Sequence, residues 1–277
     1  MAGDRNTIGL IAGGKQFPVL VAQGVKERGD KLVIVGFTGH TNMDVVPYAD
    51  VWEEMKLGKL KKMIAYFQKN GVQKIIMAGT INKPKVMDVR HLDMKALKLV
   101  FKQKNKGDSA ILGILAEEFE REGMPVLPAH EYLPGLLTPA GIMTQKAPDE
   151  REWDDLRFAW GIGKELGKMD IGQCVVVREG IVSAVEALEG TDVTIRRGCE
   201  LGGKGCVVLK VFKPGQQEQI DLPSLGLDTI KTMAAGGATC LGIEAEKSLF
   251  FDRSEAIRYA DLHGISIVGI TPEQFTS

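Results

Sequence analysis

The sequence lacks a hydrophobic run long enough to cross a membrane. A transmembrane helix needs about 20 predominantly apolar residues, and no stretch of this chain approaches that length. The residues from Met1 to Asn6 also lack the apolar segment of a signal peptide. The sequence therefore predicts a cytoplasmic protein.

An excess of either charge is also missing. Lys and Arg number 35 against 36 Asp and Glu, so the net charge is −1. Bulk charge of this kind does not attract nucleic acid, and an anionic ligand has to be met by a local cluster of cations. We therefore expect no nucleic-acid partner.

The usual metal-binding patterns of cysteine and histidine are absent. None of the four cysteines forms a Cys-x-x-Cys pair, and the four histidines form no His-x-x-x-His pair. This pattern argues against a zinc site and favours reduced thiols. If the protein binds a metal, we expect ligands with oxygen atoms.

The chain has 277 residues, enough for two domains. Apolar runs at 7–14 and 31–37 flank a helical pattern at 16–28, and this β-α-β order is typical of a parallel sheet with ligands at its carboxyl edge. We predict an α/β protein with a Rossmann-like N-terminal domain (1–136), a linker rich in turn formers (137–149) and a mixed α/β C-terminal domain (150–277).

The glycine turn after the first strand does not fit a dinucleotide site. The fingerprint Gly-x-Gly-x-x-Gly requires glycine where Ile11 stands, and no acidic residue follows the second strand. Gly13 and Gly14 then either form a strand-helix turn or let the backbone approach a phosphate or sugar closely. Lys83 is either a ligand contact or a solvated lysine, and Asp108 either a helix N-cap or part of a phosphate-binding loop.

Carboxylates and cations gather between residues 184 and 229. The acids stand at turn signals, Glu189-Gly-Thr-Asp192 and Asp221-Leu-Pro223. Acidic side chains can hold Mg²⁺, while Arg and Lys neutralise phosphate oxygens. The stretch therefore predicts phosphoryl chemistry, with a surface ion-pair network as the alternative.

Candidate roles follow from this stretch. Asp221 is the first choice for holding the metal or orienting water, and Asp192 and Glu189 are the second choices; turn or cap roles are the alternatives for all three. Lys210 or Lys213 would face the phosphates. If the Arg196-Arg197 pair is extended, its side chains point to opposite sides, so at most one of them contacts phosphate.

Seven short motifs follow one another along the chain in a specific order and spacing. They are Ala12-Gly-Gly14 with Phe17-Pro18, Lys106-Gly-Asp108, Ala129-His-Glu-x-Leu-Pro134, Glu186-Ala-x-Glu-Gly-Thr-Asp192 with Arg196-Arg197, Lys210-x-x-Lys213-Pro-x-Gln216, Asp221-x-Pro-x-x-Gly226-x-x-Thr229 and Glu244-Ala-x-x-Ser248-Leu. Together they resemble the UDP-2,3-diacylglucosamine pyrophosphatase family of lipid A biosynthesis, LpxI type. The chain departs from the family pattern at Gln217 and Gln219, where charged residues are expected.

The resemblance implies Mg²⁺-dependent hydrolysis of UDP-2,3-diacylglucosamine to UMP and 2,3-diacylglucosamine 1-phosphate (lipid X). From the residues themselves, we expect Asp221 and Asp192 to hold the Mg²⁺ or Mn²⁺ ion. We expect the substrate at the domain interface and a peripheral contact with the cytoplasmic face of the inner membrane. A homodimer is compatible with the sequence. The expected substrate contacts are Gly13, Gly14, Phe17, Lys83, Asp108, Thr191, Arg196, Lys210, Lys213, Gln216, Thr229 and Glu244. The alternative is a non-catalytic nucleotide-sugar or lipid-binding protein on the same fold.

Overall fold

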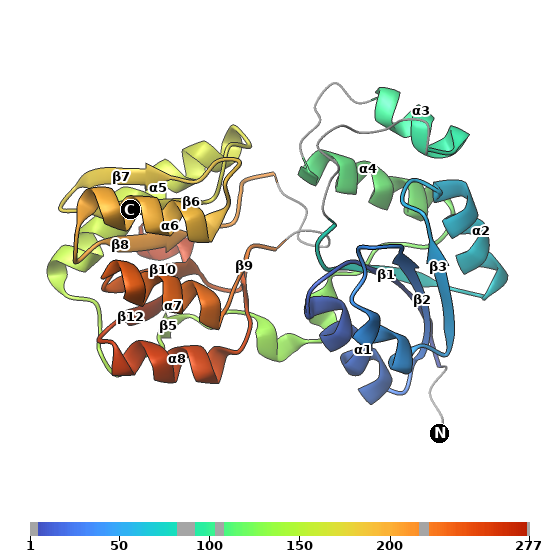
Figure 1. Cartoon of the computed structure of the whole chain (residues 1–277), viewed down its shortest axis with the longest axis horizontal. Coiled ribbons are helices and arrows are strands. Elements are labelled where there is room, and N and C mark those ends of the chain that lie inside the picture. The colour runs from blue at the N-terminus through green and yellow to red at the C-terminus, as the bar shows by residue number, and fades with distance from the viewer. Residues whose placement is uncertain (1–4, 82–91, 103–107, 216–221, 276–277) are drawn as a thin grey trace. The chain divides into compact units, whose positions relative to one another are not determined.

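The computed structural model describes residues 5–81, 92–102, 108–215 and 222–275. These residues form two compact units, one ending at Pro134 and the other beginning at Gly135 (Figure 1). Within the described ranges, every helix is too short or too polar to cross a bilayer.

Four parallel strands form the sheet of the first unit, in the order β3-β2-β1-β4. The strands are β1 (Thr7–Ala12), β2 (Lys31–Phe37), β3 (Val51–Met55) and β4 (Lys74–Ala78). This order belongs to the Rossmann-like folds. The predicted N-terminal parallel sheet is therefore confirmed.

Helices cover both faces of the first sheet. They are α1 (Phe17–Glu27), α2 (Leu60–Lys69), α3 (Met94–Lys102) and α4 (Asp108–Arg121), with the short 3-10 helices Met43–Tyr48 and Ala129–Glu131. Leu32 and Ile34 of β2 share a core with α1, whereas Val33 and Val35 share one with α2. Because successive residues of a strand point to opposite faces, a sheet covered on both sides has continuous apolar strands.

The second unit is built on a six-stranded mixed sheet, in the order β5-β12-β10-β8-β6-β7. Its members are β5 (Gly141–Ile142), β6 (Cys174–Arg178), β7 (Ile181–Val185), β8 (Val207–Lys210), β10 (Cys240–Glu244) and β12 (Ser266–Ile270). The three central strands β8, β10 and β12 are parallel, and β5, β6 and β7 pair antiparallel. The α/β class predicted for the C-terminal domain is confirmed, and the structure shows that its sheet is mixed.

Four helices pack on the second sheet. Helix α5 (Glu150–Lys168) shares a core with Val175 and Leu209, while α6, α7 and α8 share the opposite core with Val176 and Val208. Their bounds are Thr191–Gly202, Leu227–Gly236 and Arg253–Leu262. A small sheet of β9 (Ser224–Leu225) and β11 (Leu249–Phe250) and the 3-10 helix Pro272–Gln274 also belong to this unit. The 3-10 helix Pro134–Leu136 begins at the last residue of the first unit.

Two segments differ from the sequence interpretation. Residues 137–149, for which a linker was expected, contain β5, which pairs with β12 at the edge of the second sheet. Arg196 and Arg197, considered as an extended pair, lie in the helix α6 (Thr191–Gly202). Gly198 lets this helix approach the sheet, since a Cβ there would lie 2.6 Å from the Cβ of Val176.

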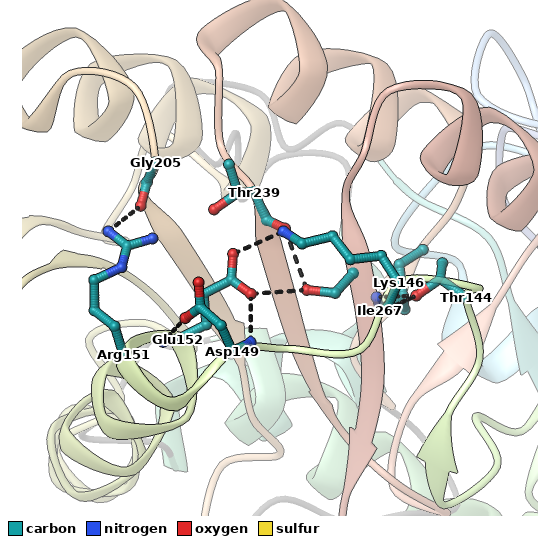
Figure 2. Close-up of polar contacts among 9 residues, drawn as sticks. Thr144, Lys146, Asp149, Arg151, Glu152, Gly205, Thr239 and Ile267 are labelled. Atoms are coloured by element: carbon teal, nitrogen blue, oxygen red, sulfur yellow. Dashed lines mark hydrogen bonds and ion pairs between the residues drawn. The ribbon is translucent and has the colours of Figure 1, made fainter.

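The buried carboxylate of Glu152 fixes the start of α5 to the second sheet (Figure 2). Its side chain is 1% exposed, and its Oε1 forms an ion pair with Lys146 Nζ at 3.0 Å. Its backbone N–H and carboxylate also form a reciprocal capping box with Asp149. On the sheet side, Ser266 Oγ donates to Glu152 Oε2 at 3.4 Å, and Lys146 Nζ reaches the carbonyl of Thr239. The cluster therefore ties residues 144–152 to the amino ends of β10 and β12.

We expect Glu152→Ala to lower the free energy of unfolding by about 2–3 kcal/mol, because it removes a buried charge partner and half of a capping box. The matched control on the same helix is Glu165→Ala, whose pair with Lys168 is 65% and 57% exposed. That change should cost no more than about 0.5 kcal/mol. Urea denaturation followed by tryptophan fluorescence measures both values, and equal losses would contradict the role given to Glu152.

Candidate functional site

The carboxyl edge of the parallel strands in the second unit carries the densest group of candidate side chains. Lys210 is the last residue of β8 and Glu244 the last residue of β10. In the strand register, Lys210 lies beside Ile243 of β10 and Cys174 of β6. Ligands of open α/β sheets bind at this edge.

Lys210 ends in a buried ammonium group. The residue is 5% exposed, and its Nζ donates to Thr191 Oγ1 at 3.0 Å and to the carbonyl of Ser224 at 2.6 Å. In the part of the chain that the structure describes, no carboxylate lies within ion-pair distance of this Nζ. A buried cation of this kind is available to an anionic ligand.

The charges around Lys210 act on the neighbouring thiol of Cys174. Burial raises the pKa of Cys174, the carboxylate of Glu186 raises it further, and the ammonium of Lys210 opposes the rise. Cys174 therefore stays protonated at neutral pH, and it is one of four buried free thiols.

Two helix starts add partial positive charge beside Lys210. Helix α6 follows Gly190 and helix α7 follows Gly226, and neither glycine has a side chain that could cap the first-turn amides. Thr229 Oγ1 of α7 donates to Asp192 Oδ1 of α6 at 3.1 Å, so the two starts lie side by side. Uncapped N–H groups at a helix start are donors for anions.

Glu244 is held by protein groups. The residue is 3% exposed, and its Oε2 accepts from Lys164 Nζ at 2.5 Å and from the amide of Phe212 at 2.7 Å. Lys164 also donates to the carbonyl of Phe212 and lies 4.9 Å from the ring centre of Trp160. Glu244 thus fixes the segment after β8 against α5. Its predicted substrate contact stays a prediction.

Glu189 and Arg197 hold the loop before α6. The carboxylate of Glu189 pairs with Arg197, which also donates to the carbonyl of Val185. Its own backbone N–H, followed by the Arg197 guanidinium, lowers the pKa of Glu189. The carboxylate is therefore ionised and engaged within its loop. Arg196 is exposed on α6, one helical step from Arg197 rather than on the opposite side of a strand.

Lys213 lies in an ion pair outside the Lys210 cluster. Its Nζ is 2.9 Å from Asp170 Oδ1, and its side chain is 17% exposed. Of the two lysines predicted to face phosphate, Lys210 is therefore the one that contacts the start of α6, through its hydrogen bond to Thr191.

Gly13, Gly14 and Phe17 follow β1 at the carboxyl edge of the sheet of the first unit. The amides of Gly13 and Gly14 donate to the carbonyls of Ala78 and Thr80 at 2.8 and 2.7 Å. A Cβ at Gly13 would lie 2.8 Å from the backbone of Gly79. These glycines therefore let the β1 and β4 loops meet. Phe17 is the first residue of α1. The start of this helix has one N–H donor fewer for a ligand, because Pro18 has no backbone N–H.

Lys83, Gln216 and Asp221 lie outside the described residues, as does the side chain of Asp108, the first residue of α4. The roles given to them stay predictions. Sequence reasoning assigned no role to Lys164 or Glu186. Lys164 could have been noticed because it stands four residues after Trp160 in an apolar helical pattern, on the same face of the helix. Glu186 could have been noticed because it belongs to the Glu186-Ala-x-Glu motif.

Comparison with known proteins adds the following. A family model described as the LpxI N-terminal domain matches residues 7–136, and one described as the LpxI C-terminal domain matches residues 139–268. A UDP-2,3-diacylglucosamine pyrophosphatase LpxI from Caulobacter vibrioides is 32% identical over 281 residues, covering 96% of this chain and 98% of that protein.

Two solved structures illustrate distant likenesses of fold. A phosphoribosylglycinamide synthetase from Anaerococcus prevotii has a TM-score of 0.28 at 10% identity, covering 74% of this chain and 45% of that chain. A short-chain dehydrogenase from Oenococcus oeni has a TM-score of 0.27 at 15% identity, covering 62% and 78%. Likenesses at this level carry no functional argument.

We expect Lys210→Met to weaken the binding of inorganic pyrophosphate by about 10- to 100-fold, the loss of one charge-assisted hydrogen bond. The control is Lys231→Met, an exposed lysine on α7, which should leave the dissociation constant within about twofold, as expected for a solvated charge. Isothermal titration calorimetry measures both. Unchanged affinity in Lys210→Met would show that pyrophosphate does not bind at β8.

Proposed function

Because this chain belongs to the LpxI family, we propose that it hydrolyses UDP-2,3-diacylglucosamine to UMP and 2,3-diacylglucosamine 1-phosphate (lipid X) in lipid A biosynthesis. The relative from Caulobacter vibrioides is named a UDP-2,3-diacylglucosamine pyrophosphatase and aligns over nearly its whole length. The observation that carries the proposal is the buried ammonium of Lys210 beside two uncapped helix starts.

In this proposal the pyrophosphate lies at the starts of α6 and α7. A pyrophosphate diester brings negative charge that grows on the leaving oxygen during hydrolysis, so catalysis consists mainly of positioning and charge neutralisation. Lys210 and the first-turn amides of the two helices supply fixed positive charge for this purpose. Water adds to one phosphorus, the bond from that phosphorus to the bridging oxygen breaks, and the water proton leaves to a carboxylate or to solvent.

Asp192 fits the role of metal ligand or water-orienting group, and unlike Asp221 it lies within the residues that the structure describes. Its Oδ1 accepts from Thr229 at 3.1 Å, which fixes the side chain in the first turn of α6. A Mg²⁺ or Mn²⁺ ion would neutralise phosphate charge and keep most of its waters, so one or two protein carboxylates suffice. Asp192 and Asp221 are the pair that we propose for it.

We predict that Asp192→Asn lowers kcat by about 100-fold or more while substrate binding is retained, because the change removes the charge but keeps an oxygen for Thr229. Asp228→Asn is the matched control: Asp228 is an exposed acid in the first turn of α7. Release of UMP from UDP-2,3-diacylglucosamine is the measurement. If the wild type binds the lipid without releasing UMP, the protein is the non-catalytic binder.

Removal of divalent cations should abolish UMP release, and Mg²⁺ or Mn²⁺ added in excess over the chelator should restore it. The physical reason is that oxygen ligands of carboxylate type select such ions. The assay compares turnover before and after treatment with excess EDTA, with metal depletion verified by mass spectrometry. Full turnover by the depleted enzyme would contradict the proposed metal dependence.

A further inference from the structure

A hydrogen-bonded chain of three side chains links β7, α6 and β8. Glu186, which directly follows β7, is 7% exposed. Its Oε1 accepts from Thr191 Oγ1 at 2.9 Å, and Thr191 Oγ1 accepts from Lys210 Nζ at 3.0 Å. The carboxylate of Glu186 therefore stands one hydroxyl group away from the ammonium of Lys210.

The hydrogen-bond chemistry fixes the direction of this chain. The ammonium of Lys210 can only donate, and a threonine hydroxyl has one proton. Thr191 Oγ1 therefore accepts from Lys210 and passes its own proton to an acceptor, which is Glu186. With a carboxylate at the end of the chain, both the lone pair and the proton of the Thr191 hydroxyl have a partner.

Glu186 is itself rigidly placed. Its Oε2 accepts from the amide of Gln173 at 3.3 Å, and its own amide donates to the carbonyl of Cys174 at 2.9 Å. A Cβ at Gly172 would lie 2.0 Å from the carbonyl oxygen of Glu186, so the glycine permits this close approach of two backbones. The carboxylate is thus a fixed reference point for Thr191.

The spacing keeps the lysine available to a ligand. The carbonyl of Ser224 and the hydroxyl of Thr191 take two of the three N–H donors of Lys210. A carboxylate in direct contact would form an ion pair and compete with phosphate oxygens. One hydroxyl away, it still offsets part of the cost of burying the ammonium.

We propose that Glu186 is a positioning residue that acts through the hydroxyl of Thr191 to hold the ammonium of Lys210 toward the pyrophosphate. The orientation of Lys210 is independent of the reaction, whereas its effect on catalysis rests on the proposed hydrolase function. Glu186 itself touches neither substrate nor metal in this account.

The experiment compares Glu186→Gln, Thr191→Val and Thr191→Ser with the control Thr194→Val. Thr194 is a fully buried threonine of the same helix whose hydroxyl donates to the carbonyl of Gly190. Valine at position 191 keeps the size but removes the hydroxyl, and serine restores it. Circular dichroism verifies folding, and the conservative variants Thr191→Ser and Glu186→Gln keep the test valid if valine impairs folding.

The first measurement is the rate at which Lys210 is acetylated by a limiting amine-reactive reagent, read by peptide mass spectrometry. We expect a several-fold faster reaction of Lys210 in Thr191→Val and Glu186→Gln, with wild-type rates in Thr191→Ser and Thr194→Val. This measurement needs no enzymatic turnover. If the variants show this labelling pattern but the wild type releases no UMP, the proposed function fails and the positioning role stands.

The second measurement is kcat/KM for UDP-2,3-diacylglucosamine. We expect a loss of about 10-fold or more in Thr191→Val, the scale of a charge-assisted hydrogen bond, with rescue by Thr191→Ser. Glu186→Gln should lower kcat/KM in the same direction. If Thr191→Val and Glu186→Gln leave both the labelling of Lys210 and kcat/KM within twofold of the wild type, Glu186 does not position Lys210 and the inference is wrong.

Discussion

The arrangement at the carboxyl edge of the second sheet depends on the ammonium of Lys210. A charge that is 5% exposed is tolerated only where acceptors surround it. Those acceptors come from two places: the hydroxyl of Thr191 opens α6, and the carbonyl of Ser224 belongs to β9. Placing Lys210 at the end of β8 therefore requires the start of one helix and a short strand from elsewhere in the chain to meet at one point.

The charged groups at this edge of the sheet are of two kinds. Some are paired with each other and stabilise the fold, and others remain available to a ligand. Lys164 and Glu244 satisfy each other and fasten α5 to the segment after β8. Glu189 with Arg197, and Lys213 with Asp170, form further pairs. Lys210 and the helix starts of α6 and α7 are left to attract an anion, with the carboxylate of Asp192 beside them. This division matches the needs of pyrophosphate hydrolysis, where positive charge has to be fixed in place before the substrate arrives.

Much of the fold could be predicted because its strands are continuous apolar runs, such as Lys31–Phe37, and because helical spacing separates them. Helix α6 was harder to predict. Val193, Thr194 and Ile195 are β-branched and favour strands, and the helix depends on Gly198 packing against Val176 of a distant strand. Within the site, the order of the motifs was enough to indicate the family. It was also possible to choose Lys210 from the sequence as a candidate phosphate contact. Partners such as Lys164 and Glu244, 80 residues apart, could not be paired without the sheet register.

The central claim is that phosphate groups bind at the starts of α6 and α7. The most direct measurement is the amide NMR spectrum of the deuterated, ¹⁵N-labelled protein during titration with inorganic pyrophosphate. The account predicts the largest shifts at Thr191, Asp192 and Val193 and at Leu227 and Asp228, whose amides lie in the first turns of these helices. Shifts confined to the turn between β1 and α1, with the α6 and α7 amides unchanged, would contradict it.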